Sequence, residues 1–464
     1  MATATRLCSY PSNCGPRMNL EERPWVEPEG EYGALSTLAA LAIVVGIVSG
    51  AVGAFYLTLL GRADRLRDAV IAWAYPHGFL GFLVVAAACS LSAGVAAWLV
   101  RRFSPIAAGS GIPHVEAVLN GELPTASFRV LPVKFAGGVL AIGSGLALGR
   151  EGPSVQMSAI IGHLVGKLFR RGWPDCRVLL AAGAGAGLAT AFNAPIAGGV
   201  FVLEELVRRF ELRIAIAALA ASATAISVSR MILGDATDFH VAALLPPAGP
   251  VYPFYFLLGA LAGLAAIVYN RLLLATMASM DRLGRWPIEA RAAVIGAAVG
   301  TLAWFAPDLV GGGDRLTERA LTGGYALALL PLLFALRLGL GSVSYAAGTP
   351  GGLFAPMLVL GAQFGLFFGQ GCRLAFPFLD IQPEGFAIVG MAAFFTGVVR
   401  APLTGIILAT EMTGNSAMLL EMVAACSMAM LTPTLLGDRP IYDSLRELTI
   451  ARAQAQRAPT ASNF

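Results

Sequence analysis

The chain has 464 residues, of which 57% are hydrophobic and only 13% are charged, and its formal net charge is +4. A soluble domain has about 25% charged residues, so this composition excludes a disordered chain, a nucleic-acid-binding module and an ordinary soluble enzyme. Because about 20 residues of helix cross a bilayer, the length and hydrophobicity predict an all-α membrane protein that crosses the membrane many times.

The two ends of the chain are polar. Residues 1–31 lack the apolar core of a signal peptide, so we expect a polar N-terminal tail, a membrane domain over 32–450 and a short C-terminal tail over 451–464. The six cysteines form no CxxC pair, and the four histidines lie far apart in the sequence. We therefore expect no disulfide framework, no metal site and no cofactor.

The apolar segments differ in length along the chain. Five are long enough to span a bilayer: 33–61, 78–100, 214–233, 250–278 and 290–310. Six others are short or interrupted by glycine and proline: 153–166, 178–190, 192–207, 352–370, 386–397 and 401–413. Helices that break at membrane depth are stable only where protein or a water-filled cavity surrounds them, and they are typical of transporters. The pattern predicts many tilted and broken transmembrane helices.

Two stretches of the sequence are similar to each other: AGAGAGLATAFNAPIAGGVFVLEEL at 182–206 and VGMAAFFTGVVRAPLTGIILATEMT at 389–413. When Pro195 is aligned with Pro402, Glu204 falls opposite Glu411. An odd number of crossings in each half would invert one half relative to the other. The repeat predicts two related halves, over about 33–235 and 250–445.

The first glycine-rich motif is Gly109-Ser110-Gly111-Ile112-Pro113. Proline suits the first turn of a helix, and glycine lets the backbone approach a ligand closely. We therefore expect Ser110 at a helix N-terminus, where free N–H groups favour an anion. The alternative interpretation is that Ser110 only caps the helix.

The second motif is Gly149-Arg150-Glu151-Gly152-Pro153, which follows an apolar run. It predicts another helix N-terminus at membrane depth, here with a carboxylate beside it. An ionisable residue inside the membrane is costly and indicates a functional site. Glu151 can occupy the place of an anion when ionised and leave it when protonated. The alternative is a structural salt bridge with Arg150.

The third motif is Gly351-Gly352-Leu353-Phe354-Ala355-Pro356, again a glycine-rich break before an apolar segment. It offers the backbone N–H groups of Leu353 and Phe354 with no competing charge. The alternative is a packed kink in which the Phe354 ring only fills the core.

Two adjacent carboxylates, Glu204 and Glu205, end an apolar helix. Such a pair is costly in a membrane unless it is protonated, paired or hydrated. Because Glu204 has a repeat counterpart in Glu411, we expect a shared structural role for it. Glu205 falls opposite Met412 and is the better candidate for proton transfer. The alternative is a solvated helix end beside two arginines, Arg208 and Arg209.

Two further charges, Glu116 and Lys134, lie near apolar segments. We expect them to form a structural ion pair. The sequence contains no legible Ser/His/Asp arrangement, so it predicts no catalytic residues and no enzyme.

With the three motifs in order, residues 33–450 closely resemble the CLC family of chloride channels and chloride/proton antiporters. The resemblance continues through FNAPIAGGVFVLEE and the Pro440-Ile441-Tyr442 segment. It implies a fold of two inverted halves and a homodimer with one pore per subunit, with both termini in the cytoplasm. The cytoplasmic regulatory domains of eukaryotic members do not follow the membrane domain, so we expect a prokaryotic protein of a bacterial inner membrane.

The resemblance also implies the roles of the motif residues in anion binding. Ser110 and Tyr442 donate their hydroxyl groups to a central chloride, and the N–H groups of Leu353 and Phe354 complete the site. The remaining motif residues form the selectivity segments around it: Gly109, Gly111, Ile112, Pro113, Gly149, Arg150, Gly152, Pro153, Gly352, Ala355 and Pro356.

By the same resemblance, Glu151 matches the external gating glutamate and Glu205 the internal glutamate of proton-coupled members. Channels of the family usually lack an acid at the second position, so the sequence predicts an H+/Cl− antiporter. A passive chloride channel of the same fold is the alternative, and a membrane-embedded enzyme is a remote one. The expected partners are chloride, protons, membrane lipid and a second copy of the chain, with no nucleic acid.

Overall fold

The computed structural model describes residues 34–235, 249–284 and 286–457, together with 239, 241, 244, 246 and 247. The expected tail over 1–31 lies outside these residues. The described chain is almost entirely helical, as the composition predicts. Its first part contains α1 (Leu35–Ala74), α2 (Gly78–Phe103), α3 (Ile112–Leu119), α4 (Val130–Gly143), α5 (Glu151–Leu168), α6 (Trp173–Phe192), α7 (Pro195–Phe201) and α8 (Leu212–Leu233).

The second part begins after residue 248 and carries nine further helices. They are α9 (Tyr252–Arg282), α10 (Ile288–Phe305), α11 (Asp314–Leu321), α12 (Leu330–Ala346), α13 (Phe354–Ala375), α14 (Pro383–Val399), α15 (Pro402–Thr413), α16 (Leu419–Leu435) and α17 (Ile441–Arg457). Short 3-10 turns occur at Tyr75–His77, Pro105–Ala107, Gly249–Val251 and Pro307–Leu309. A π-helical turn, η4 (Val202–Leu206), follows α7.

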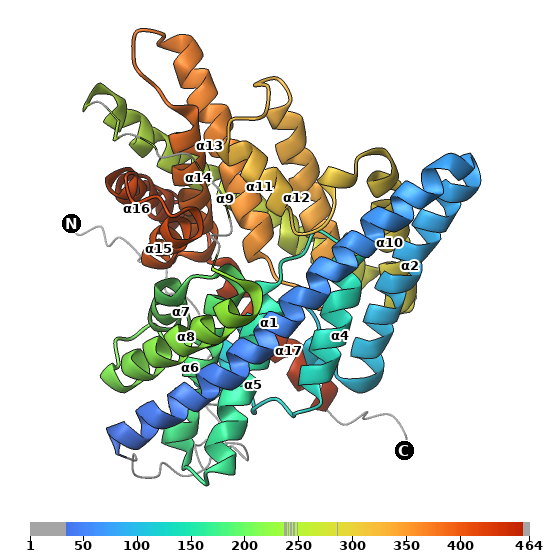
Figure 1. The fold of residues 1–464 in the computed structure, drawn as a ribbon, viewed down its shortest axis with the longest axis vertical. Helices are drawn as coiled ribbons and strands as arrows, with labels where there is room; N and C mark the ends of the chain where they lie inside the picture. Colours follow the sequence, from blue (N-terminus) through green and yellow to red (C-terminus); the bar gives the residue numbers. More distant parts are fainter. Residues whose placement is uncertain are drawn as a thin grey trace, which may run out of the picture.

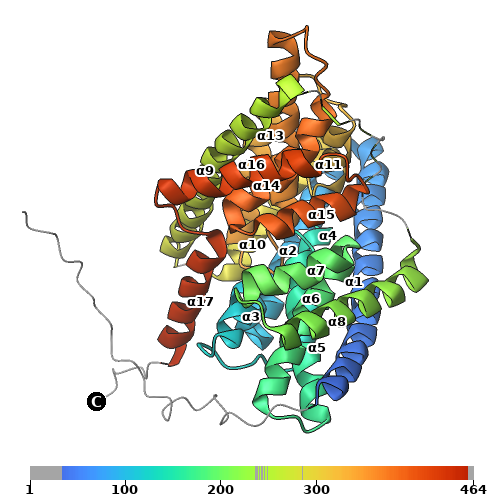
Figure 2. The same cartoon turned by 90° about the vertical axis from the view of Figure 1, so that its left-hand side faces the viewer.

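The two halves repeat the same helix packing. In the first half α1 packs against α6 and α8, and α5 packs against α6. In the second half α9 packs against α14 and α16, and α13 packs against α14. The short helices α7 and α15 contact each other where the halves meet (Figures 1 and 2). The predicted all-α fold of two related halves is therefore confirmed.

Both halves also break their chain in the same way. Asn193 and Arg400 adopt left-handed backbone conformations, with φ of 51° and 71°. Two residues later, Pro195 and Pro402 begin α7 and α15. A left-handed residue ends a helix, and a proline in the first turn starts the next one. The repeated Ala-Pro pair thus marks an equivalent sharp turn in each half.

The segment 178–190, which the sequence predicts to be short or interrupted, lies within the continuous 20-residue helix α6. Its glycines serve packing instead of ending the helix. A Cβ at Gly183 would lie 2.1 Å from the carbonyl oxygen of Ser158, and one at Gly187 would lie 2.3 Å from that of Ser154. Glycine therefore lets the backbones of α5 and α6 approach closely, as small residues do between membrane helices.

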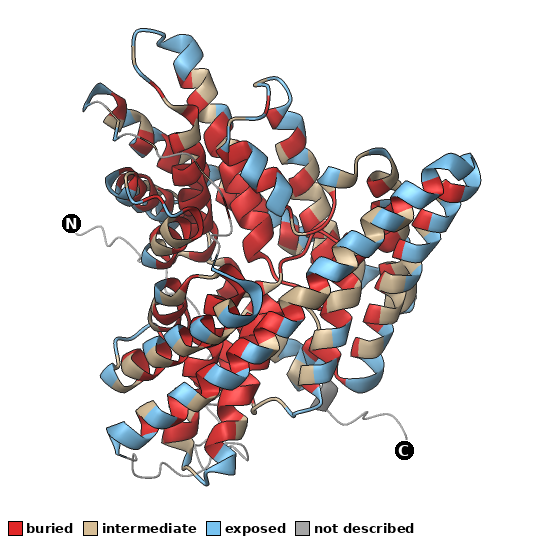
Figure 3. Ribbon diagram, in the orientation of Figure 1, coloured by how far each residue is buried: buried red, intermediate tan, exposed pale blue. Residues whose placement is uncertain are grey.

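Six helical stretches of the described residues are long and apolar enough to cross a membrane. They overlap all five predicted long segments, although the helix predicted over 290–310 ends at Phe305. They also include α6 and α13, where the sequence predicts short or interrupted segments. Buried residues gather where α5, α6, α13 and α14 pack at the centre of the molecule (Figure 3). The last helix, α17, continues past the tail boundary expected at residue 450 and ends at Arg457.

Candidate functional site

The three glycine-rich motifs meet at the centre of the fold. The Gly109 N–H donates to the Thr349 carbonyl at 3.0 Å, and the Gly351 N–H donates to the Gly109 carbonyl at 3.0 Å. Gly149 and Gly352 exchange two N–H···O bonds, at 2.9 and 2.7 Å. These short bridges join the ends of α2, α4 and α12 and bring the starts of three helices together.

The carboxylate of Glu151 lies at the N-terminus of α13. Its Oε1 accepts the N–H of Phe354 at 2.6 Å and the N–H of Ala355 at 3.2 Å. The side chain is fully buried, and its Oε2 has no hydrogen-bond partner among the described residues. Leu353 is the N-cap residue of the same helix and is buried beside them. Because free N–H groups at a helix start favour negative charge, Glu151 lies where an anion could bind.

The neighbours of Glu151 hold its loop in place. The Arg150 Nε donates to the Ala191 carbonyl at 2.9 Å, and its Nη1 lies 3.7 Å from Asp314 Oδ2. A Cβ at Gly152 would lie 2.5 Å from Ser110 Oγ. Glycine at this position therefore allows the second motif to lie directly against the first.

Ser110 and Tyr442 present the two predicted hydroxyl groups. Ser110 precedes α3 and Tyr442 lies in the first turn of α17, which packs against α3. Both residues are buried, and neither hydroxyl has a hydrogen-bond partner among the described residues. The capping alternative is wrong, because Gly111 is the N-cap of α3 and no side chain caps that helix. Buried hydroxyl groups normally find a partner, so both are available to an anion.

Phe354 both fills the core with its ring and offers its backbone N–H as a donor. Its ring packs in an aromatic core, with centroids 4.7 Å from Phe395 and 5.6 Å from Phe201. Its backbone N–H donates to Glu151. Phe201 ends α7, which leads into the turn that carries Glu205. Phe354 therefore connects the surroundings of the two carboxylates.

Glu204 and Glu411 make reciprocal contacts between the halves. Glu204 accepts backbone N–H bonds at 2.9 and 2.7 Å from the start of α15, and Glu411 accepts two at 3.1 and 2.8 Å from the start of α7. Exchange of the same contact in both directions is characteristic of a two-fold relation. The two carboxylates thus cap each other's helices and join the halves.

We expect Glu411→Gln to lower thermal stability without changing ion transport. The amide keeps one acceptor oxygen but places an NH2 group against the second backbone donor. Hydrogen bonds to charged groups contribute about 1.5–3 kcal/mol each, so thermal unfolding in detergent should begin several degrees lower. Glu318→Gln, at an exposed position of α11, is the matched control. An unchanged unfolding temperature would contradict the capping role.

Glu205 makes quite different contacts from its neighbour. Its side chain is buried, and its Oε1 lies 3.3 Å from Arg208 Nη2. The same nitrogen lies 3.5 Å from Glu116 Oε1, and Arg208 Nη1 lies 2.7 Å from Asp443 Oδ1. The alternative of a solvated helix end is therefore wrong, although Glu205 does pair with Arg208. Its position in a π-helical turn is one often found at functional sites.

The acids around Arg208 outnumber the bases. Arg446 adds contacts of 3.7 Å to Glu116 and 3.3 Å to Glu122. Sequence reasoning missed this cluster, although Glu116, an ionisable residue in an apolar stretch, indicated it. Four carboxylates and two guanidinium groups form the cluster: Glu116, Glu122, Glu205 and Asp443 with Arg208 and Arg446.

The predicted ion pair between Glu116 and Lys134 is wrong. The Lys134 Nζ donates to the carbonyls of Ala107 and Gly109, at 3.1 and 2.7 Å, whereas Glu116 pairs with arginines. A buried ammonium group needs acceptors, and the loop before α3 supplies them. Lys134 therefore supports the backbone of the segment that carries Ser110.

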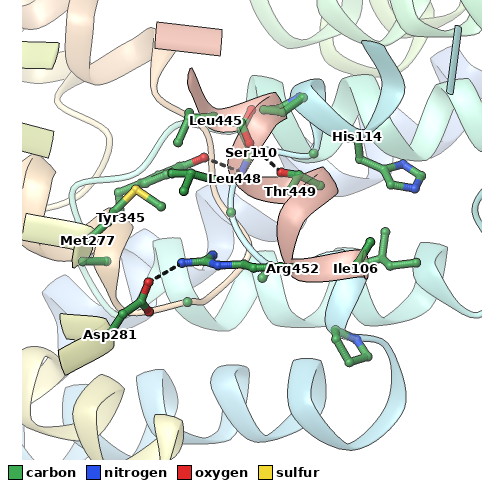
Figure 4. Close-up of a pocket in the computed structure, with 18 of the residues that line it drawn as sticks. Ile106, Ser110, His114, Met277, Asp281, Tyr345, Leu445, Leu448, Thr449 and Arg452 are labelled. Atoms are coloured by element: carbon green, nitrogen blue, oxygen red, sulfur yellow. Dashed lines mark hydrogen bonds and ion pairs between the residues drawn. The ribbon is translucent and has the colours of Figure 1, made fainter. Parts of the chain in front are cut away.

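Two cavities approach the site past different faces of α17. One, of about 480 Å³, extends to Ser110 and is lined on the α17 side by residues such as Leu445 and Arg452 (Figure 4). The other, of about 380 Å³, is lined by residues that include Arg208 and Arg446. Leu445 and Arg452 are seven residues apart and share one face of α17, whereas Arg446 follows Leu445 directly and lies on another face. The hydroxyl site and the acid cluster are thus approached separately.

Known proteins similar to this chain match it over most of its length. Residues 92–434 match the family described as voltage gated chloride channel. The H(+)/Cl(-) exchange transporter ClcA of Vibrio cholerae serotype O1 (strain M66-2) is 39% identical over 430 residues, or 90% of each chain. The protein of that name from Klebsiella pneumoniae (strain 342) is 37% identical over 429 residues, covering 91% of this chain and 90% of its own.

Solved structures agree with these sequence matches. The crystal structure of a slow cyanobacterial Cl-/H+ antiporter matches with a TM-score of 0.86 and 33% identity, over 91% of this chain and 99% of that one. A CLC-type fluoride/proton antiporter, 22% identical with a TM-score of 0.74 over 89% and 98%, shares the fold. The chain belongs to the voltage gated chloride channel (CLC) family. It is a multi-pass membrane protein whose named relatives are transporters, not enzymes.

Proposed function

We propose that this protein exchanges chloride for protons across a membrane. The observation that carries the proposal is the Glu151 carboxylate, which accepts the N–H groups at the start of α13. An ionised Glu151 excludes an anion from this position, whereas a protonated Glu151 gives up the N–H groups to it. The same side chain therefore binds a proton when chloride enters and releases it when chloride leaves, as an exchanger requires.

In this proposal chloride binds between the hydroxyl groups of Ser110 and Tyr442 and the N–H groups of Leu353 and Phe354. The burial of all four residues removes competing water, which strengthens the attraction between an anion and these dipoles. The remaining motif residues bring backbone to the ion or begin its helices: Gly109, Gly111, Ile112, Pro113, Gly149, Arg150, Gly152, Pro153, Gly352, Ala355 and Pro356.

Glu205 is the second proton-carrying group of the proposal. It lies in the acid cluster around Arg208, and the cavity there is separate from the cavity that reaches Ser110. Protons and chloride can therefore approach by different routes. Outward chloride and inward protons move charge in the same direction, and each elementary charge is worth about 2.3 kcal/mol per 100 mV. We expect exchange to depend on voltage.

Reconstitution into liposomes tests the proposal directly. Chloride efflux and proton uptake are recorded together, with a proton gradient imposed in the absence of a chloride gradient. We expect that gradient to drive chloride uphill. Chloride flux without proton movement would favour the passive channel, and no flux of either ion would reopen the question of an enzyme.

We expect Tyr442→Ala to weaken both chloride binding and coupling. The substitution removes one of the two hydroxyl groups and leaves a gap beside the Phe354 ring, whose centroid lies 6.0 Å from that of Tyr442. Calorimetric titration of chloride on the solubilised variant should show an affinity roughly tenfold lower, as for loss of a hydrogen bond to an ion. Unchanged affinity together with unchanged coupling would remove Tyr442 from the site.

We further propose a homodimer in the inner membrane of a bacterium, as the resemblance implies. The bacterial relatives support this location. The helices α7, α8, α15 and α16 lie on one side of the molecule (Figure 2) and expose apolar side chains. The exposed residues include Ile196, Leu219, Leu403, Leu420 and Leu431, and we propose that this surface contacts the second subunit. Counting fluorescent subunits in single liposomes tests the proposal.

A further inference from the structure

Tyr345 brings a third hydroxyl group to the cavity that leads to Ser110. It is the next-to-last residue of α12, is 7% exposed and lines the 480 Å³ cavity. Figure 4 shows its oxygen directed toward Ser110. The three glycine-rich motifs contain no signal for this residue, because it enters from a helix that precedes the third motif.

The Tyr345 hydroxyl is held by the backbone of the first motif. Its oxygen accepts the N–H of Ser110 at 3.3 Å. Gly109 makes room for it, since this residue has a φ of 64° and an added Cβ would lie 3.1 Å from the hydroxyl oxygen. The position of the hydroxyl is therefore set by the same residue that presents Ser110 Oγ.

The O–H of Tyr345 is left available for donation. A tyrosine hydroxyl can accept and donate at the same time, and its oxygen already accepts the bond from Ser110. Among the described residues, no acceptor receives the Tyr345 O–H. A donor that has no acceptor in the protein gains most from an acceptor that carries charge.

The charged groups that line the cavity favour an anion. Arg291 and Arg452 contribute two positive charges. Asp281 contributes one negative charge and pairs with Arg452 at 2.7 Å (Figure 4). His114 also lines the cavity, and with a neutral imidazole the charged side chains sum to +1. The excess positive charge, which comes from Arg291 beside the Arg452–Asp281 pair, raises the local concentration of anions.

We propose that the Tyr345 hydroxyl binds chloride at the α17 end of the pathway and passes it to Ser110. The inference rests on the proposed function and adds a chloride ligand at the end of the pathway that lies beside α17. An ion in the cavity accepts the Tyr345 O–H while it is still partly hydrated. It then moves to the Ser110 Oγ, which the Ser110–Tyr345 bond holds close to the Tyr345 oxygen.

The substitution Tyr345→Phe tests the proposal, because it removes the hydroxyl and keeps the ring. Calorimetric titration of the solubilised protein should show chloride affinity lowered roughly tenfold, the effect of losing one hydrogen bond to an ion. In planar bilayers with the protein in one orientation, the half-saturating chloride concentration should rise on the α17 side only. Coupling to protons should remain.

The control is Tyr255→Phe, which removes a buried tyrosine hydroxyl on α9 where the ring stacks on Phe386. We expect wild-type affinity for this variant. Wild-type affinity in Tyr345→Phe, or an equal loss on both sides of the bilayer, would overturn the proposal. Because calorimetry needs no transport, wild-type protein that binds chloride but moves no ions would count against the proposed exchange and not against the Tyr345 ligand.

Discussion

Replacing Glu205 by glutamine should stop proton transport while chloride still crosses the membrane. The amide preserves the shape of the side chain and its proximity to Arg208, which lies 3.3 Å away, but it cannot bind and release a proton. Proton uptake by liposomes driven by a chloride gradient should fall to the level of protein-free vesicles. Chloride efflux from the same vesicles should persist.

Glu204→Gln is the matched control, because it makes the same chemical change one residue earlier. Glu204 caps α15 and belongs to the reciprocal contacts between the halves. The variant should therefore lose stability or expression, while the protein that remains exchanges chloride for protons. Proton transport by Glu205→Gln at the wild-type rate, or uncoupling by Glu204→Gln alone, would show that the wrong carboxylate has been assigned.

The second large effect is expected for Glu151→Gln. The neutral side chain imitates a protonated Glu151 and can no longer supply a negative charge to the N–H groups of Phe354 and Ala355. Chloride flux should continue, should no longer vary with pH and should carry no protons. Chloride efflux measured between pH 4.5 and 7.5, with proton uptake recorded in parallel, tests this expectation.

The pH dependence of chloride flux distinguishes the Glu151→Gln variant from the Glu205→Gln variant. Loss of both the pH dependence and the coupling is expected at position 151, whereas at position 205 Glu151 remains able to titrate and chloride flux should stay sensitive to pH. Retained coupling in Glu151→Gln would exclude this residue from the gate. Glu318→Gln, at an exposed position, should match the wild type in both measurements.

Local patterns predicted the helix starts around the site and the pairing of the two halves correctly. The three motifs indicated helix starts because glycine followed closely by proline restricts the backbone to few conformations. The repeat alignment paired Glu204 with Glu411, and the structure shows their reciprocal contacts. That alignment was informative because two halves under the same packing constraints retain the same residue at the same break.

Other predictions failed where a residue's partner is distant in the chain. The glycines of α6 suggested a short or interrupted helix in the sequence. Only the position of α5 shows that they allow the backbones of the two helices to approach closely. Lys134 was paired with Glu116 because both are charged, whereas two backbone carbonyls of a folded loop accept its bonds. Asp443 joins Arg208 from 235 residues away in sequence, because α17 packs beside α3.

Sequence alone determined the class of protein, its two halves and the residues that begin each helix at the site, since these depend on composition and on local backbone preferences. Only the tertiary structure decided what each side chain contacts. The Glu151 carboxylate reaches N–H groups more than 200 residues away, and Glu204 and Glu205 separate into a helix cap and an acid cluster. The Tyr345 hydroxyl accepts the N–H of Ser110, which lies 235 residues away in sequence. Such contacts depend on how helices pack, because burial and charge act between neighbours in space.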